Sequence, residues 1–348
     1  MDLCPGGQEV VRLHAMETDT RRAWRRMQDI LFYTRWAEWY PGKVPLLLSV
    51  ALLAKLKNPA ALNVWDLLTW YGGVVAFLAF AYMVNNVSDR YIDRLAGKAV
   101  HLADWTVRAK VLLISGVGAS GVALALLRGN WRSVVGWSFC YMLACGYSWP
   151  PRWKEDPALG PIVASAGQMV APAAVLVWIT DTWSLALLAY LLLLFFFGLR
   201  MILLHQLLDR ACDSATGVRT TVLVMGPERS VVLLKVFFAM ECACLAAGVS
   251  LWWKWLWTPI IPIVFGLPAL HVLGRYRLGL PVRLTTYEYI PMADILEFSI
   301  PTLLSLSLVS RDGLSQLWFP VVCWVPFVRR HWLRAEETVS IIWGAVHA

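Results

Sequence analysis

The feature that most limits the fold of this chain is a series of long apolar segments. Runs such as 185–204 and 231–253 are long enough for a helix to cross the roughly 30 Å of hydrocarbon in a bilayer. With 59% apolar residues among 348, the composition is too apolar for an ordinary water-soluble domain. The sequence therefore predicts an all-α protein, a polytopic transmembrane helical bundle of about nine spans. These are expected near 32–57, 65–86, 109–127, 132–148, 159–179, 184–208, 230–253, 256–274 and 292–310, and a shorter stretch at 314–328 is a candidate tenth span.

The distribution of positive charge predicts the orientation of these spans. The first 29 residues are rich in arginine and lack the apolar core of a signal peptide, so they are expected to form a cytoplasmic leader. Threading the chain from that leader places most loop lysines and arginines on the cytoplasmic side. Membrane topology then explains the formal net charge of +8, and nucleic-acid binding is not expected. Three regions are predicted, a leader at 1–29, a transmembrane domain at 30–310 and a C-terminal segment at 311–348 with an optional extra span and a tail.

Two segments far apart in the chain carry the same ladder of polar residues. Both read polar residue, Asp and Asp at intervals of four, then Gly, and corresponding positions are 120 residues apart. Aspartates at i and i+4 lie on one face of a helix, where their like charges repel. Both ladders follow a long apolar segment and fall on the cytoplasmic side, so the repulsion is explained if a multivalent cation such as Mg²⁺ is bound. The residues are Asn85, Asp89, Asp93 and Gly97 in the first ladder, and His205, Asp209, Asp213 and Gly217 in the second.

A simpler explanation of the ladders is a set of salt bridges at helix ends, formed with Arg90, Arg94 and Arg210. That explanation suffices for either ladder alone. The occurrence of two matched ladders at corresponding span ends favours the metal site. A parallel internal duplication of a helical unit is consistent with their placement after the second and sixth spans, and paired repeats with a site at their interface occur in other membrane proteins.

A third segment supplies positive charge on the same side. It follows the fourth span and reads Tyr147-Ser148-Trp149-Pro150-Pro151-Arg152-Trp153-Lys154. The proline pair favours an extended turn, which directs Arg152 and Lys154 toward a phosphate group. Lys98 and Arg219, just beyond the two ladders, are further candidates. By itself the segment could be an ordinary positively charged loop, but beside two acidic ladders it predicts a clamp for a diphosphate.

These three motifs, in this order and spacing, resemble the signature of the UbiA superfamily of intramembrane prenyltransferases over residues 30–310. The resemblance implies a helical bundle, usually of nine spans, around a central cavity that faces the cytoplasm. It also implies transfer of an isoprenyl group from a magnesium-bound prenyl diphosphate to an acceptor. The motifs are Asn85-x-x-x-Asp89-x-x-x-Asp93, Tyr147-Ser148-x-Pro150-Pro151, and Asp209-x-x-x-Asp213-x-x-x-Gly217-x-Arg219-Thr220.

The resemblance assigns roles to the residues that match these motifs. One magnesium ion is expected on Asn85, Asp89 and Asp93, and a second on Asp209 and Asp213, so that two or more ions are bound and the four aspartates are catalytic. The diphosphate is expected to contact Asn85, Lys98, Tyr147, Arg152, Lys154 and Arg219.

Departures from the superfamily pattern leave the acceptor open. Asn86 stands where many members have Asp, and the segment after the first ladder begins at Lys98 without the Arg-Pro pair common in members that act on quinone precursors. The loop after Pro151 is also one residue shorter before its arginine. We expect a small hydrophobic, probably aromatic, acceptor.

Two alternatives remain at this stage. A terpene cyclase of the same superfamily would form a cyclic product from the prenyl diphosphate alone, without an acceptor. A secondary transporter would instead place its carboxylates near the bilayer midplane, whereas these ladders lie at span ends. Arg200, inside the sixth span, is expected either to have a partner in the protein or to contact phosphate.

Overall fold

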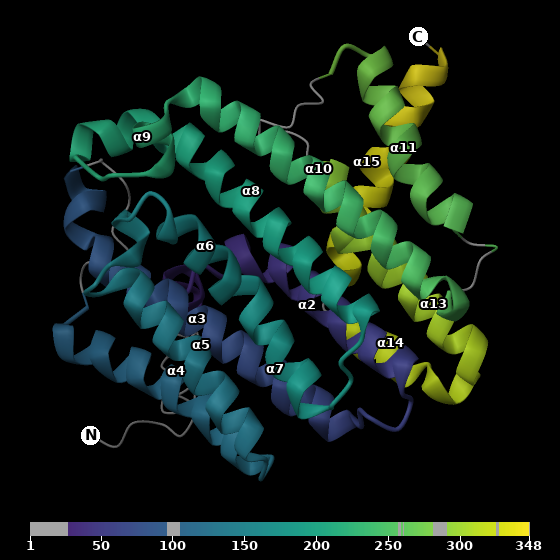
Figure 1. The fold of residues 1–348 in the computed structure, drawn as a ribbon, viewed down its shortest axis with the longest axis horizontal. Helices are drawn as coiled ribbons and strands as arrows, with labels where there is room; N and C mark the ends of the chain where they lie inside the picture. Colours follow the sequence, from purple (N-terminus) through teal and green to yellow (C-terminus); the bar gives the residue numbers. More distant parts are fainter. Residues whose placement is uncertain are drawn as a thin grey trace, which may run out of the picture.

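The computed structural model describes residues 27–95, 105–256, 259, 261–280, 291–324 and 327–347. These residues form helices and connecting turns without any β-strand, which confirms the predicted all-α class (Figure 1). By length and composition, six helical segments are able to cross a membrane, namely Val64–Leu95, Val107–Leu127, Leu159–Ile179, Leu185–Thr216, Pro227–Trp252 and Pro291–Asp312. Their positions agree with six of the predicted spans, and the total of nine or ten stays a prediction.

The helices follow one another with short connections along the chain. The first half contains α2 (Trp36–Lys57), α3 (Val64–Leu95), α4 (Val107–Leu127), α5 (Trp131–Ser148), the 3₁₀ turn η1 (Trp153–Glu155), α6 (Leu159–Ser165), the π-helix η2 (Ala166–Val170) and α7 (Ala171–Ile179). The second half contains α8 (Leu185–Thr216), α9 (Thr221–Met225), α10 (Pro227–Trp252), η3 (Trp253–Trp255), α11 (Ile261–Arg277), α12 (Pro291–Asp294), the π-helix η5 (Ile295–Ser299), α13 (Ile300–Asp312), η6 (Leu314–Gln316), α14 (Trp318–Trp324) and α15 (Val328–His347).

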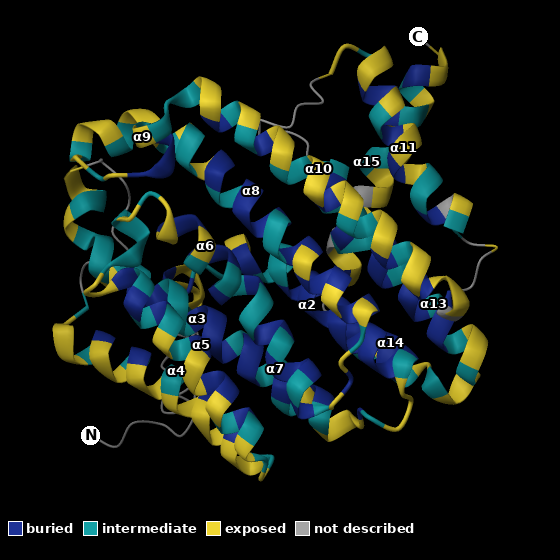
Figure 2. Ribbon diagram, viewed as in Figure 1, coloured by how far each residue is buried: buried dark blue, intermediate teal, exposed yellow. Residues whose placement is uncertain are grey.

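The centre of the bundle is α2, which is apolar on all sides and has a continuous buried stretch from Val44 to Leu56. A helix of that kind must be surrounded by other helices, and α3, α7, α8 and α13 pack around it. Helices α4 and α10 lie on the outside, where only 17% of each apolar window is buried (Figure 2). Their exposed leucines and valines form a surface suited to lipid contact.

Helices α3 and α8 carry the two aspartate ladders and have the same length of 32 residues. Ser184 begins α8 by accepting a hydrogen bond from the backbone N–H of Leu187, and Gly217 ends it in the left-handed conformation at φ 73°. Both ladders therefore lie within the last turns of a long helix. This placement agrees with the duplication suggested by the spacing of the motifs.

The candidate tenth span at 314–328 divides into the 3₁₀ turn η6 and the seven-residue helix α14. It is therefore shorter than a membrane-crossing helix within the part of the chain that the structure describes. The segment that follows forms α15, which packs against α11 (Figure 1). His271 Nδ1 lies 2.9 Å from Thr338 Oγ1 at this contact.

A buried ion pair joins α8 to α10. Arg200 donates from Nε to Glu241 Oε1 at 2.5 Å and from Nη2 to Glu241 Oε2 at 2.8 Å, and both side chains have zero exposure. The guanidinium also lies 5.5 Å from the ring centroids of Phe197 and Phe238. Of the two roles expected for Arg200, the structure therefore shows a partner within the protein.

We predict that Glu241→Gln will lower the stability of the bundle strongly, because it leaves the Arg200 charge buried without a counter-ion. Removal of one member of such a pair costs about 3–5 kcal/mol. Thermal unfolding of the purified protein in lipid nanodiscs measures the effect. The double variant Arg200→Leu with Glu241→Leu should recover most of the loss, since no charge is then left unpaired. Equal stability of Glu241→Gln and the unmodified protein would contradict the prediction.

Candidate functional site

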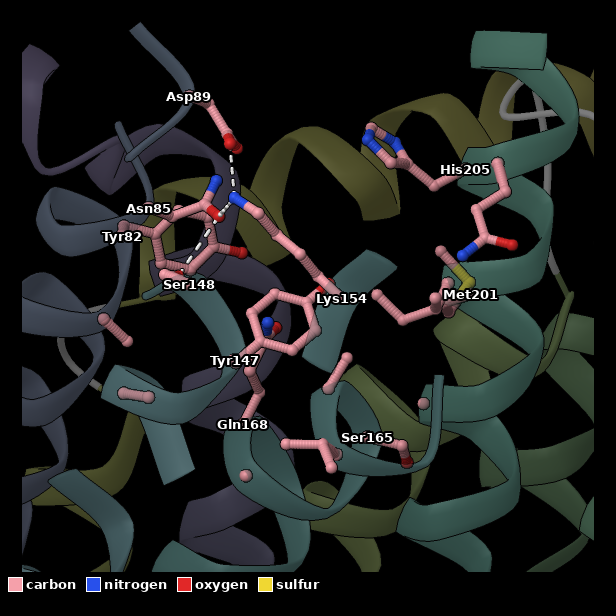
Figure 3. A pocket seen from close by; sticks show the side chains of 18 of the residues that line it. Tyr82, Asn85, Asp89, Tyr147, Ser148, Lys154, Ser165, Gln168, Met201 and His205 are labelled. Carbon is pink, nitrogen blue, oxygen red and sulfur yellow. Dashed lines mark hydrogen bonds and ion pairs between the residues drawn. The ribbon is translucent and has the colours of Figure 1, made fainter. Parts of the chain in front are cut away.

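A cavity of about 830 Å³ lies between α2, α3, α5, α6, η2 and α8. Both ladders line it, from opposite sides, as the positions of Asp89 and His205 in Figure 3 show. Eight of the ten predicted site residues therefore share one cavity, namely Asn85, Asp89, Asp93, Tyr147, Arg152, Lys154, Asp209 and Asp213.

The other two predicted site residues are placed differently. Arg219 is exposed and is not part of the lining, although its neighbours Val218 and Thr220 are. Lys98 lies outside the described residues. Their contact with a diphosphate stays a prediction.

The loop between α5 and α6 directs its cations into the cavity. The Pro150–Pro151 peptide is cis, and Arg152 adopts the left-handed conformation at φ 56° and ψ 54°. The chain then turns back so that the Trp153 ring packs on Gly146, where an added Cβ would lie only 2.5 Å from the ring. Because Gly146 has no side chain, the ring can approach α5 closely and Lys154 is directed toward α3.

Lys154 is surrounded by oxygen atoms of the first ladder. Its Nζ donates to Asn85 Oδ1 at 3.1 Å and to Ser88 Oγ at 2.8 Å, and it forms an ion pair with Asp89 (Figure 3). Burial lowers the pKa of the Lys154 amine, and the charge of Asp89 opposes that shift. The ammonium group thus occupies a position where three oxygens converge.

Arg152 is engaged chiefly by an acidic residue that the sequence did not single out. Its Nη2 lies 2.6 Å from Glu155 Oε1 and 3.6 Å from Asp89 Oδ1. Glu155 also lines the cavity, three residues further along the loop. The pair holds the guanidinium beside the first ladder, within reach of a phosphate that would compete with Glu155 for it.

The second ladder has a looser arrangement. His205 Nε2 lies 3.4 Å from Asp209 Oδ2, one helical turn away. Gln206 also lines the cavity, and its Oε1 is buried without a hydrogen-bond partner among the described residues. A buried oxygen of this kind is costly unless something binds it. A cation or a ligand donor at this wall would satisfy it.

The side chains present fit magnesium, which prefers oxygen ligands and completes its octahedron with water and substrate phosphates. Carboxylate and carboxamide oxygens line both walls, and the Lys154 ammonium already occupies one cluster of them. Within the described ranges, no group of three or more His, Cys, Asp and Glu side chains is close enough to hold an ion alone. The protein therefore offers part of a coordination shell that a diphosphate can complete.

Three further polar residues of the cavity were missed as site residues. Lys43 of α2, Tyr82 of α3 and Gln168 of η2 line its inner part. Lys43 could have been recognised, because a charge that interrupts an apolar span is usually functional. Gln168 had no such signal, since its direction depends on a π-helix that the sequence does not reveal.

Comparison with known proteins identifies the class. The UbiA prenyltransferase family matches residues 42–283, which is more than half of the chain. The chain therefore belongs to the UbiA prenyltransferase family, as its motifs suggested. No curated protein sequence matches it.

Solved structures show the same fold. A UbiA homolog from Archaeoglobus fulgidus bound to GPP and Mg²⁺ is 17% identical with a TM-score of 0.52, covering 92% of this chain and 98% of that chain. The same homolog bound to DMAPP and Mg²⁺ is 16% identical with a TM-score of 0.53 and the same coverage. An apo UbiA homolog from Aeropyrum pernix K1 is 16% identical with a TM-score of 0.58, covering 77% and 98%. At these identities the likeness establishes the fold alone.

We predict opposite effects of Lys154→Met on two ligands. Binding of Mn²⁺ alone, measured by electron paramagnetic resonance, should become about fivefold tighter, because no ammonium competes for Asn85 and Asp89. Binding of geranyl diphosphate with Mg²⁺, measured calorimetrically, should weaken about tenfold through loss of a charge-assisted hydrogen bond. The control Lys235→Met removes an exposed amine of α10 outside the cavity lining and should change neither value. A parallel change in both affinities of Lys154→Met would contradict the prediction.

Proposed function

We propose that this chain is a membrane-embedded prenyltransferase that moves an isoprenyl group from a prenyl diphosphate to a small, probably aromatic, acceptor and releases pyrophosphate. One observation carries the proposal. Two aspartate ladders from α3 and α8 and the cations Arg152 and Lys154 line a single cavity of about 830 Å³. Its volume is within the range of small-molecule sites, and its charges suit a metal-bound diphosphate.

The ladders and the loop cations have complementary roles in this proposal. Asn85, Asp89 and Asp93 would hold one magnesium ion, and Asp209 and Asp213 another. The ions, when bound, supply positive charge that stabilises the leaving diphosphate. Arriving phosphate oxygens would draw Lys154 away from the first ladder, and this exchange frees ladder oxygens as the diphosphate gains a hydrogen bond.

The reaction needs a dry chamber next to the diphosphate. The allylic C–O bond breaks and its electron pair leaves with the pyrophosphate, after which a nucleophilic atom of the acceptor bonds to the allylic carbon. The proton displaced from that atom passes to the pyrophosphate or to water. Deeper in the cavity, side chains such as Phe77, Leu143 and Met201 form an apolar wall that excludes water from the allylic cation.

We place the mouth of the site on the cytoplasmic side of the membrane. This orientation is supported by the positive-inside pattern of the loops. The ladders lie in the last turns of α3 and α8, at the same end of the bundle as the Arg152 loop. The leader at 1–29 and the C-terminal segment at 311–348 would lie outside the catalytic unit.

The aspartates provide the direct test of this function. Asp89→Asn and Asp209→Asn should each lower Mg²⁺-dependent pyrophosphate release by about 100-fold or more, because each removes a negative ligand of similar size. Asp181→Asn, in the exposed turn before α8, is the matched control and should keep full activity. Activity that survives both ladder substitutions, or that is unchanged by a metal chelator, would overturn the proposal.

Product analysis separates the transferase from the terpene cyclase. Purified protein with geranyl diphosphate and Mg²⁺ alone should release pyrophosphate slowly and form no cyclised hydrocarbon. Addition of a suitable acceptor should raise the rate and yield a prenylated product. A cyclic hydrocarbon formed without acceptor, detected by gas chromatography, would identify a cyclase instead.

A further inference from the structure

A second polar cluster lies in the inner part of the cavity, away from the aspartates. Lys43 Nζ donates to Tyr82 Oη at 2.6 Å and also to Gln168 Oε1. These residues come from α2, α3 and the π-helix η2, which are distant in sequence. All three line the cavity that holds the ladders.

The cluster presents hydrogen-bond donors to the cavity. An ammonium group has three N–H donors, and Lys43 uses two of them within the cluster. Because Tyr82 Oη accepts from Lys43, its own proton is available to a ligand, and so is the amide NH₂ of Gln168. Among the described residues, no other hydrogen bond engages these donors. A ligand that matches three donors must be rich in acceptor oxygens.

The cluster also carries an uncompensated positive charge. Within the described part of the chain, Lys43 has no carboxylate within salt-bridge distance, whereas neighbouring Arg35 is paired with Glu38. A cavity charge of this kind disfavours an allylic cation unless an anion lies between them. A chamber built only to hold a carbocation would not contain an ammonium group.

The position of the cluster suits the second substrate. Tyr82 precedes Asn85 by three residues and Asp89 by seven on α3, which corresponds to about 10 Å along the helix from Asp89. Figure 3 shows the same order, with Asp89 at one end of the view and Gln168 toward the other. An acceptor bound at the cluster would thus lie next to the reacting end of a diphosphate held by the ladders.

The Tyr82 ring is held rigidly for this role. It stacks on Trp39, which has zero exposure, with ring centroids 6.4 Å apart and an interplanar angle of 27°. The Lys43 ammonium lies 4.8 Å from the centroid of the same ring. A preformed donor set of this kind binds its ligand with little loss of side-chain entropy.

We propose that Lys43, Tyr82 and Gln168 form the acceptor subsite and bind an oxyanion of the acceptor, a carboxylate or an ionised phenol. This inference rests on the proposed prenyl transfer and specifies the chemical class of its second substrate. The acceptor's charge interacts with Lys43, and its nucleophilic atom points toward the diphosphate.

Binding of two matched probes tests the subsite. The full chain in lipid nanodiscs is loaded with Mg²⁺ and geranyl thiodiphosphate, an analogue that ionises slowly, and titrated with 3-hydroxybenzoate or its neutral counterpart 3-hydroxybenzamide. The benzoate should bind about tenfold more tightly, as expected for a charge-assisted hydrogen bond. Lys43→Met should reduce this ratio to about one, and Tyr82→Phe, which keeps the ring, should reduce it partially.

Two measurements keep the outcome unambiguous. Lys57→Met, at the other end of α2 and outside the cavity lining, is the matched control and should keep the ratio of the unmodified protein. Equal affinity of the unmodified protein for the two probes, or an unchanged ratio in Lys43→Met, would overturn the subsite. Binding of geranyl thiodiphosphate is measured first in each protein. Its absence in the unmodified protein would count against the proposed function, whereas its presence with an unchanged ratio counts only against the subsite.

Discussion

The structure depends on an excess of negative charge in a cavity enclosed by apolar helices. Six acidic and four basic side chains line this cavity, and two of the acids come from each of the ladders. Carboxylates in such surroundings repel one another and are poorly solvated. Arg35 and Arg152 are paired with Glu38 and Glu155, and Lys154 contacts only the first ladder. Divalent cations are the natural means of balancing what remains, which explains why the ladders oppose each other across the cavity.

The rest of the bundle holds these charges in place. The buried core of α2 sets the spacing of α3 and α8, and the Arg200–Glu241 pair fixes α10 against α8 below the second ladder. Because both members of that pair are fully buried, neither can move without exposing an unpaired charge to an apolar environment. A rigid frame allows the ladders to face each other before any ion binds.

The parts of this arrangement that sequence could predict are those encoded locally. The i, i+4 spacing of Asp89 and Asp93 determines that they share a helix face, and apolar length alone located the helices that carry the ladders. Contacts between distant segments were not predictable in this way. The partner of Arg200 lies 41 residues away, and Gln168 meets Lys43 across 125 residues through a π-helix. The predicted tenth span was uncertain for a related reason, because Pro320 and Pro326 interrupt a pattern whose outcome depends on packing.

Under the two proposals, the opposite ends of the cavity have opposite electrostatic preferences. The ladder end would bind cations and, through them, a diphosphate, while the Lys43 end favours an anion. A prenyl diphosphate that enters tail first would therefore place its allylic carbon between a leaving pyrophosphate and an acceptor oxyanion. The resulting allylic cation is attracted to both and is repelled from an unoccupied Lys43. Ionisation then becomes favourable mainly when the acceptor is present, and this coupling protects the prenyl diphosphate from unproductive hydrolysis.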